Sequence, residues 1–218
     1  MAKRIFLIHP YRPSMAPIEE AFARRWPQAT VFNLLEESLY AEVDEAGRFP
    51  QTLIPRIRAL FDYAELAGAD GAVFTGSTFG PAVGEARAGL RIPIFKSDEA
   101  MAEAAVKLGR RIGILCTAER AIPVIGAGVS EAARQAGKAI ELVSHWVPQA
   151  QALLNAGKRA EHDALVLTAA AKATDCDVLL IGQVSMAPVA KEIASVPGRT
   201  VLTSPDTAVV KMRMLLGD

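Results

Sequence analysis

The sequence predicts an α/β protein built from two similar four-stranded parallel sheets with helices around them. Three observations lead to this fold class. Short β-type runs alternate with longer helical patterns along all 218 residues, an arrangement typical of parallel sheets. The chain also resembles itself at an offset of 107 positions, and 51% of its residues are hydrophobic, enough to bury a sizeable core. We therefore expect two α/β halves related by a pseudo-twofold axis.

The strands are expected where apolar and β-branched residues run together between turn signals. The first run follows a basic N-terminus and stops at His9 and Pro10, too short for a secretion signal or a membrane span. We interpret it as the first strand of a cytoplasmic protein. The eight predicted strands cover residues 5–8, 30–34, 72–75, 92–95, 112–116, 139–143, 178–181 and 200–203.

The helices between these strands carry start and stop signals. Ser97, Asp98 and Glu99 open the segment DEAMAEAAVKL with an acidic first turn, which suits the helix dipole, and Gly109 closes it. Pro81 is expected to start another helix directly after the loop GSTFG, because proline is favoured at the first helical position.

The internal repeat locates the two halves. KRIFLIHP aligns with RRIGILCT, and GSTFGPAVGE aligns with QVSMAPVAKE at the same offset. With one inserted residue, FKSDEA aligns with LTSPDTA, which pairs Asp98 with Asp206. Chance similarity between α/β units is the alternative, but one offset fits two widely separated strand–loop units. We expect a first half of residues 1–97 and 207–218, and a second half of residues 98–206.

Two facing halves would place both sets of strand tips around one cleft, where ligands bind in parallel sheets. The loop at Gly76 should then face the loop at Gln183. Ser77 and Thr78 precede a helix start and suit an anion, better a carboxylate than a phosphate, since nucleotide-binding lysine and glycine spacings are absent. The alternative is that these hydroxyls only cap the helix. The predicted ligand-binding residues are Thr75, Gly76, Ser77, Thr78, Phe79, Thr117, Gln183, Val184, Ser185 and Met186.

Two titratable side chains end strands at the same expected cleft. His9 has an ordinary pKa near neutrality and could act as a general acid or base. Cys116, its repeat counterpart, is the thiol best placed for such work. The alternatives are a histidine hydrogen-bonded to loop backbone and a cysteine buried as a small hydrophobe. Asp98 and Asp206 could also titrate in the cleft, or serve as first-turn acids of their helices.

The amino-acid composition indicates which class of ligand the protein binds. Lys plus Arg and Asp plus Glu both count 24, so no net charge draws the chain to a nucleic acid or an anionic membrane. Two cysteines, with no paired Cys or His spacing, indicate neither a disulfide framework nor a metal site. We expect a small-molecule ligand.

The loop sequences carry a family resemblance over essentially the whole chain. VFTGSTFGPA and LLIGQVSMAP, with IPIFKSDEAM and TSPDTAV, resemble the aspartate/glutamate/hydantoin racemase superfamily, which includes arylmalonate decarboxylase and maleate isomerase. The resemblance implies a racemase-like fold, an inter-domain cleft, no cofactor and a homo-oligomer. In that family two facing cysteines move protons at the α-carbon of a carboxylate substrate. Gly76 and Gln183 stand at those two positions here.

Neither glycine nor an amide transfers protons at useful pH, so two-thiol racemisation is chemically unavailable. The arylmalonate decarboxylase branch resembles Gly76-Ser77-Thr78 at the first position but keeps the second cysteine, which Gln183 replaces. Two functions remain open. One is a cofactor-independent isomerase or decarboxylase-like lyase acting on a small carboxylate or amino-acid derivative, with His9 or Cys116 as proton carrier. The other is a catalytically inactive homologue that binds or senses such a ligand. A chain engineered from cysteine at position 76 is a third alternative.

Overall fold

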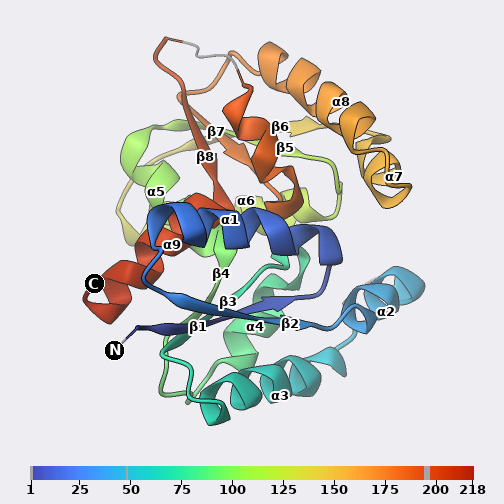
Figure 1. Cartoon of the computed structure of the whole chain (residues 1–218). Helices are drawn as coiled ribbons and strands as arrows, with labels where there is room; N and C mark the ends of the chain where they lie inside the picture. Colours follow the sequence, from blue (N-terminus) through green and yellow to red (C-terminus); the bar gives the residue numbers. More distant parts are fainter. Residues whose placement is uncertain (1, 48, 194–196) are drawn as a thin grey trace.

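The computed structural model describes residues 2–47, 49–193 and 197–218, without the side chain of Pro81. Within these residues the chain forms two four-stranded parallel sheets, in the orders β2-β1-β3-β4 and β6-β5-β7-β8 (Figure 1). The predicted α/β fold class is confirmed. The strands are β1 (Arg4–His9), β2 (Thr30–Leu35), β3 (Gly71–Phe74), β4 (Ile94–Lys96), β5 (Arg111–Cys116), β6 (Glu141–Trp146), β7 (Val178–Ile181) and β8 (Thr200–Thr203).

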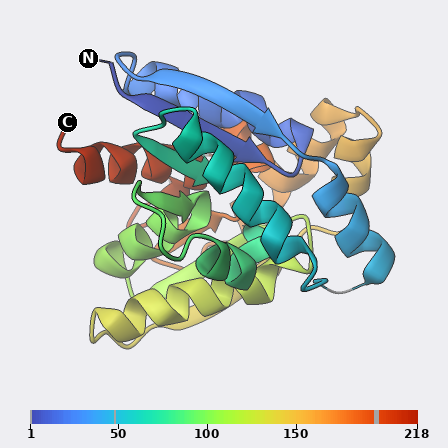
Figure 2. The same cartoon turned by 90° about the horizontal axis from the view of Figure 1, so that it is seen from below.

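Helices connect successive strands and cover both faces of each sheet. Figure 2 shows helix α3 lying across the outer side of the first sheet, with the two chain ends close together. No helix in the described part of the chain is long and apolar enough to cross a bilayer. The helices are α1 (Met15–Arg25), α2 (Ser38–Ala46), α3 (Leu53–Leu66), α4 (Gly80–Ala86), α5 (Ser97–Leu108), α6 (Ala121–Gln135), α7 (Ala150–Asn155), α8 (Arg159–Lys172) and α9 (Ser204–Leu216), with 3-10 turns η1 (Arg12–Ser14), η2 (Ser77–Phe79) and η3 (Val184–Lys191).

The two sheets repeat the same strand order, and the offset of 107 positions carries through to the helices. α5 begins at Ser97 and α9 at Ser204, so no inserted residue is needed before these helices. Asp206 therefore corresponds to Glu99, and the predicted pairing with Asp98 is wrong. Both acids lie in the first turn of a helix and accept a hydrogen bond from the residue that precedes that helix. Glu99 accepts from the Lys96 N–H, and Asp206 accepts from the Thr203 hydroxyl.

Three predicted strands are only lengthened, to residues 4–9, 30–35 and 111–116, whereas three others are displaced along the chain. The fourth strand begins at Ile94 because Pro93 has no N–H for the ladder, although its carbonyl accepts a hydrogen bond from Ala72. The sixth begins at Glu141, since a turn with Gly137 in the left-handed conformation first closes α6. The third ends at Phe74 rather than residue 75.

Successive side chains along each strand point to opposite faces of the sheet and pack into a separate core on each face. In the first half, Phe6 and Ile8 point to α2, α3 and α4, while Ile5 and Leu7 point to α1 and α9. In the second half, Ile114 faces α5 and α6, whereas neighbouring positions pack against α8 and η3. This alternation also decides where the strand-tip residues point.

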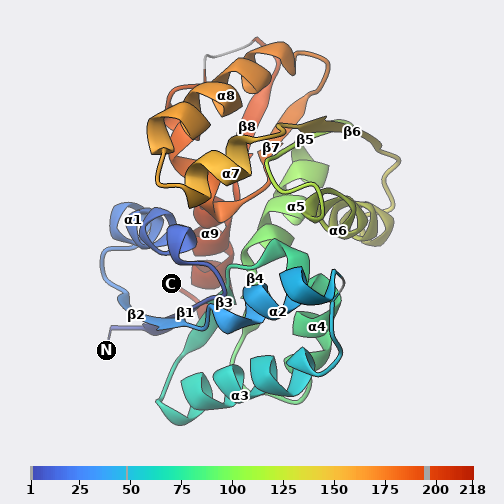
Figure 3. The same cartoon turned by 90° about the vertical axis from the view of Figure 1, so that its right-hand side faces the viewer.

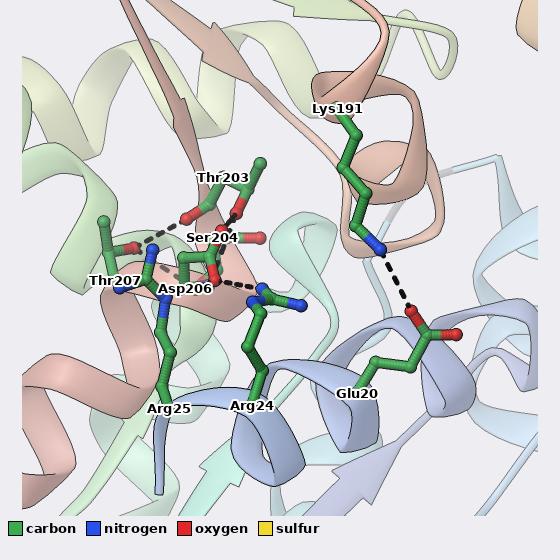
Figure 4. A network of polar contacts seen from close by, with 8 residues as sticks. All are labelled: Glu20, Arg24, Arg25, Lys191, Thr203, Ser204, Asp206 and Thr207. Atoms are coloured by element: carbon green, nitrogen blue, oxygen red, sulfur yellow. Dashed lines mark hydrogen bonds and ion pairs between the residues drawn. The ribbon is translucent and has the colours of Figure 1, made fainter.

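Helix α1 of the first sheet also joins the second sheet through ion pairs (Figure 4). Arg24 and Arg25 donate to one carboxylate oxygen of Asp206 at 2.5 and 2.6 Å, and Lys191 lies 3.7 Å from Glu20. These partly exposed pairs contribute little stability individually. They nevertheless fasten α1 to the start of α9 and to the end of η3, the turn that follows Gln183.

A cleft between the two sheets as candidate functional site

A cleft of about 830 Å³ lies between the two halves. One wall is formed by the loop after β1, helix α2 and η2, and the other by the loops after β5 and β6, helix α7 and Gln183. Figure 3 shows α2 and α7 on the same side of the molecule, one below the other. The lining residues are Pro10, Tyr11, Arg12, Pro13, Glu37, Tyr40, Val43, Asp44, Thr78, Thr117, Ala118, Glu119, Arg120, Trp146, Gln149, Gln151, Ala152, Leu154, Asn155 and Gln183.

The loops after β3 and β7 meet at this cleft. The Ser77 hydroxyl donates a hydrogen bond to the carbonyl oxygen of Gly182 at 3.3 Å. Thr78 and Gln183 both line the cleft, while Ser77 itself is buried between the loops. The strand tips of the two sheets therefore face one another, as parallel sheets of this arrangement allow.

Gln183 is held by a neutral hydrogen-bond network. Its Oε1 accepts from the backbone N–H groups of Thr117 and Ala118 at 2.7 and 3.0 Å, and lies 2.9 Å from the Thr117 hydroxyl. Its Nε2 donates to Gln151 Oε1 at 3.0 Å, and Gln151 in turn donates to the Tyr11 hydroxyl at 2.9 Å. The position that the family resemblance gives to a thiol is thus occupied by an amide with both ends bonded.

Gly76 is enclosed by apolar rings. A Cβ atom at this position would lie 2.7 Å from side-chain atoms of each of Phe74, Phe79 and Pro10. The two phenylalanine rings pack edge to face with centroids 5.6 Å apart, so they cannot withdraw without disturbing the core. The surrounding side chains already fill the space that a cysteine side chain would need.

His9 is fully buried and does not line the cleft. Its Nδ1 and Nε2 each lie 2.9 Å from a partner, the Thr75 hydroxyl and Asn33 Oδ1, and Asn33 donates to Glu19 at 2.6 Å. Burial lowers the pKa of His9, against smaller raising effects of the Asn33 hydrogen bond and the Glu19 charge. The imidazole is therefore neutral near pH 7, with both nitrogens engaged inside the first half.

Cys116 is also fully buried, on the face of β5 that packs against α5 and α6. Burial, with a smaller effect of the Asp98 charge, raises the pKa of its thiol to about 12. A thiol of this kind is neither a nucleophile nor a base at neutral pH. Asp98 itself pairs with the buried Lys96 at 2.9 Å, and neither Asp98 nor Asp206 lines the cleft.

The remaining predicted residues lie around the two loops rather than at the cleft surface. Val184 packs in the core between the first sheet and helices α1 and α9, and Met186 packs in the core between the second sheet and α8. The Ser185 carbonyl accepts a hydrogen bond from Arg159 at 2.8 Å. The Phe79 ring packs edge to face against Phe74, and the Thr75 hydroxyl is hydrogen-bonded to Nδ1 of His9. Of the predicted set, Thr78, Thr117 and Gln183 line the cleft.

Several lining side chains were not predicted from the sequence. The cleft is also lined by Tyr11, Arg12, Tyr40, Arg120 and Trp146. Trp146 is 47% exposed, and its indole N–H donates a hydrogen bond to the Thr117 carbonyl at 3.4 Å. Tyr11 and Arg120 follow the first strands of the two halves by two to four residues. Residues that line the cleft therefore continue further past the strand ends than the sequence motifs indicated.

Two side chains, Tyr11 and Arg120, form straps across the cleft to short helices that correspond under the internal offset. Tyr11, after β1, donates to Asn155 in α7 at 2.5 Å and accepts from Gln151. Arg120, after β5, forms an ion pair with Asp44 in α2. Asp44 and Gln151 are related by the 107-residue offset, so each half reaches over the cleft to the corresponding short helix of the other. One strap is neutral and the other is charged.

Comparison with known proteins settles the family. The sequence profile described as Asp/Glu/Hydantoin racemase matches residues 16–212. The chain belongs to this family. No curated protein matches the chain significantly by sequence.

Solved structures share the fold at low sequence identity. An aspartate racemase from Picrophilus torridus has a TM-score of 0.74 at 11% identity, covering 99% of this chain and 95% of its own. An allantoin racemase from Klebsiella pneumoniae has 0.72 at 18%, covering 99% and 88%. A glutamate racemase from Francisella tularensis in complex with D-glutamate has 0.68 at 14%, covering 99% and 81%. These likenesses establish the racemase fold for the chain.

Proposed function

We propose that this racemase-family protein binds a small carboxylate or amino-acid derivative in the cleft and does not transfer its α-proton by the two-thiol mechanism. The lining of the cleft carries the proposal. Arg12 and Arg120 bring guanidinium groups from opposite halves, and Glu37 and Asp44 stand beside them. Carboxylates and ammonium groups are the natural partners of such paired charges.

The charged strap leaves capacity for a ligand. A guanidinium has five N–H donors, more than the Asp44 carboxylate and the Val43 carbonyl take from Arg120. The Arg120 side chain is about half exposed, so a ligand in the cleft can reach it. The glutamate racemase complexed with D-glutamate provides a precedent for an amino-acid ligand on this fold.

A binding or sensing protein is favoured over an enzyme of the isomerase or lyase type. The two expected proton carriers, His9 and Cys116, are buried outside the cleft, and burial raises the pKa values of the lining phenols Tyr11 and Tyr40. Of the lining carboxylates, Glu37 and Asp44 are held in ion pairs with Arg12 and Arg120, and Glu119 is another carboxylate at the cleft.

Titration calorimetry tests this proposal. The panel contains D- and L-aspartate, D- and L-glutamate, hydantoin and malonate. We expect at least one carboxylate to bind with a Kd below about 1 mM, and Arg120→Gln to weaken it roughly tenfold through loss of a charge-assisted hydrogen bond. Arg134→Gln, which removes a guanidinium from the exposed side of α6, is the matched control. Binding of hydantoin alone, or equal effects of both variants, would contradict the proposal.

A further inference from the structure

The amide oxygen of Gln183 faces a cluster of hydrogen-bond donors that would also suit an anion. Two backbone N–H groups and the Thr117 hydroxyl lie within 3.0 Å of it. Because backbone N–H groups can only donate, the atom that faces them is the oxygen. A carbonyl oxygen has two lone pairs and no formal charge, whereas a carboxylate would offer two oxygens and a negative charge to the same donors.

The Thr117 hydroxyl, in contrast, has more acceptors within reach than it has protons to donate. It lies 2.9 Å from Gln183 Oε1 and 3.0 Å from Gln151 Oε1 and has one proton to donate. Gln183 Nε2 already supplies Gln151 Oε1. If a ligand carboxylate oxygen took the place of the Gln183 amide oxygen, its negative charge would attract the Thr117 hydroxyl proton away from Gln151.

These donors lie at the surface of the cleft. Thr117, Ala118 and Gln183 all line it, so the two N–H groups would be free for a molecule in the cleft if the Gln183 side chain moved away. Besides the donors themselves, the hydrogen bond to Gln151 opposes this movement, and Gln151 also binds Tyr11 of the opposite half. The amide is thus held in place by the neutral strap.

We infer that Gln183 is a built-in occupant of a carboxylate site, and that a ligand carboxylate binds by displacing its amide oxygen from Thr117 and Ala118. The inference rests on the proposed function, since the cleft has to admit the ligand. It assigns Gln183 a role in selectivity: an anionic oxygen competes with the amide for these N–H groups better than a neutral one does. Gln151 is a positioning residue that strengthens the occupant.

The test follows the Thr117 and Ala118 amide resonances of 15N-labelled protein while acetate is added. In Gln183→Ala, we expect both resonances to shift saturably with an apparent Kd about tenfold lower than in the wild type, because the ligand no longer displaces a competitor. Gln151→Leu frees the amide end of Gln183, leaves the Thr117 and Ala118 backbone N–H groups in place, and should give an intermediate gain. Gln135→Ala, on the exposed side of α6, should match the wild type.

Unshifted Thr117 and Ala118 resonances in Gln183→Ala, or acetate affinity no higher than in the wild type, would overturn the inference. If Gln183→Ala does not fold, Gln183→Ser and Gln151→Leu carry the same comparison. The two proposals fail separately. The proposed function fails when wild-type protein takes up no carboxylate from the panel, and the inference fails when wild-type protein binds but the Gln183 variants gain nothing.

Discussion

The loops at Gly76 and Gln183 are filled in opposite ways. Gly76 is closed by the rings of Pro10, Phe74 and Phe79, whereas Gln183 fills a polar niche made by Thr117 and Ala118. Pro10 and Thr117 are equivalent under the internal offset, and proline has no N–H to donate. The cleft is therefore apolar beside one family cysteine position and rich in donors beside the other. This asymmetry suits holding an anion from one side better than exchanging a proton between two sides.

The residues behind the loops differ in the same way. His9 and Cys116 are equivalent, as are Thr75 and Gly182. In the first half His9 binds the Thr75 hydroxyl, while in the second half Cys116 packs where a side chain at position 182 would be. A pseudo-symmetric backbone is thus stabilised by a hydrogen bond on one side and by close packing on the other.

Gly182→Ala should give the largest effect. Its Cβ would lie 2.3 Å from Cys116 Sγ and 3.0 Å from the Leu115 carbonyl oxygen, so we expect a loss of about 3 kcal/mol in the free energy of unfolding. Denaturant titration measures it. Cys116→Ala in the same chain should recover part of the loss, a non-additive result, since the closest atom is gone. Gly128→Ala, with open space around it in α6, should be neutral or stabilising. Strictly additive effects would contradict the packing account.

Gly76→Cys should cost about 1 to 3 kcal/mol in the free energy of unfolding, because three apolar side chains must move. It should also fail to create racemase activity, since Gln183 remains opposite. Gly84→Ala in α4 is the matched control, with no atom within 4 Å of the new Cβ. Thermal and chemical denaturation measure the stability of both variants. An unchanged stability of Gly76→Cys would show that the space around position 76 can accept a side chain.

The pH dependence of stability separates the two halves further. Burial lowers the pKa of His9, so below about pH 6.5 the unfolded chain binds a proton that the folded chain does not. Stability should then fall as pH decreases, by at most about 1.4 kcal/mol per pH unit for this group. His9→Gln should show a shallower slope between pH 7 and 5 in denaturant titrations. An identical slope in both proteins would assign the dependence to other groups.

The two straps give the smallest expected difference. Arg120→Gln should lower the free energy of unfolding by about 0.2 to 1 kcal/mol, because the pair with Asp44 is half exposed. High salt should remove most of that difference by screening. Tyr11→Phe, at the neutral strap, should respond little to salt. Equal salt dependence of the two variants in unfolding titrations would break the comparison.

Much of the architecture follows from periodic patterns that a single sequence contains. The strand order repeats because both halves repeat one pattern, and the loops at Gly76 and Gln183 meet because parallel strands end at the same edge. The same alternation places His9 on the face of Ile5 and Leu7, under α1, and so away from the cleft. That consequence was readable from the sequence once the sheet face was considered.

The partners of the site residues were not readable in this way. Asn33 reaches His9 from the neighbouring strand, and Gln151 reaches Gln183 from a short helix in another loop. Contacts between side chains so far apart depend on loop geometry and rotamers, which no local pattern fixes. The burial of His9 and Cys116 has a different origin, because it follows from the strand faces on which they lie.

The central claim is that the cleft binds a carboxylate without exchanging its α-proton. A 1H NMR experiment in D2O tests it most directly, because binding and proton exchange are measured on the same sample. A carboxylate that binds in calorimetry is mixed with the wild-type protein, and its α-proton signal is followed together with saturation transfer from the protein. We predict clear saturation transfer and an α-proton signal that keeps its full intensity over days. Loss of the α-proton signal at a rate proportional to protein concentration would show that the cleft exchanges protons and would contradict the account.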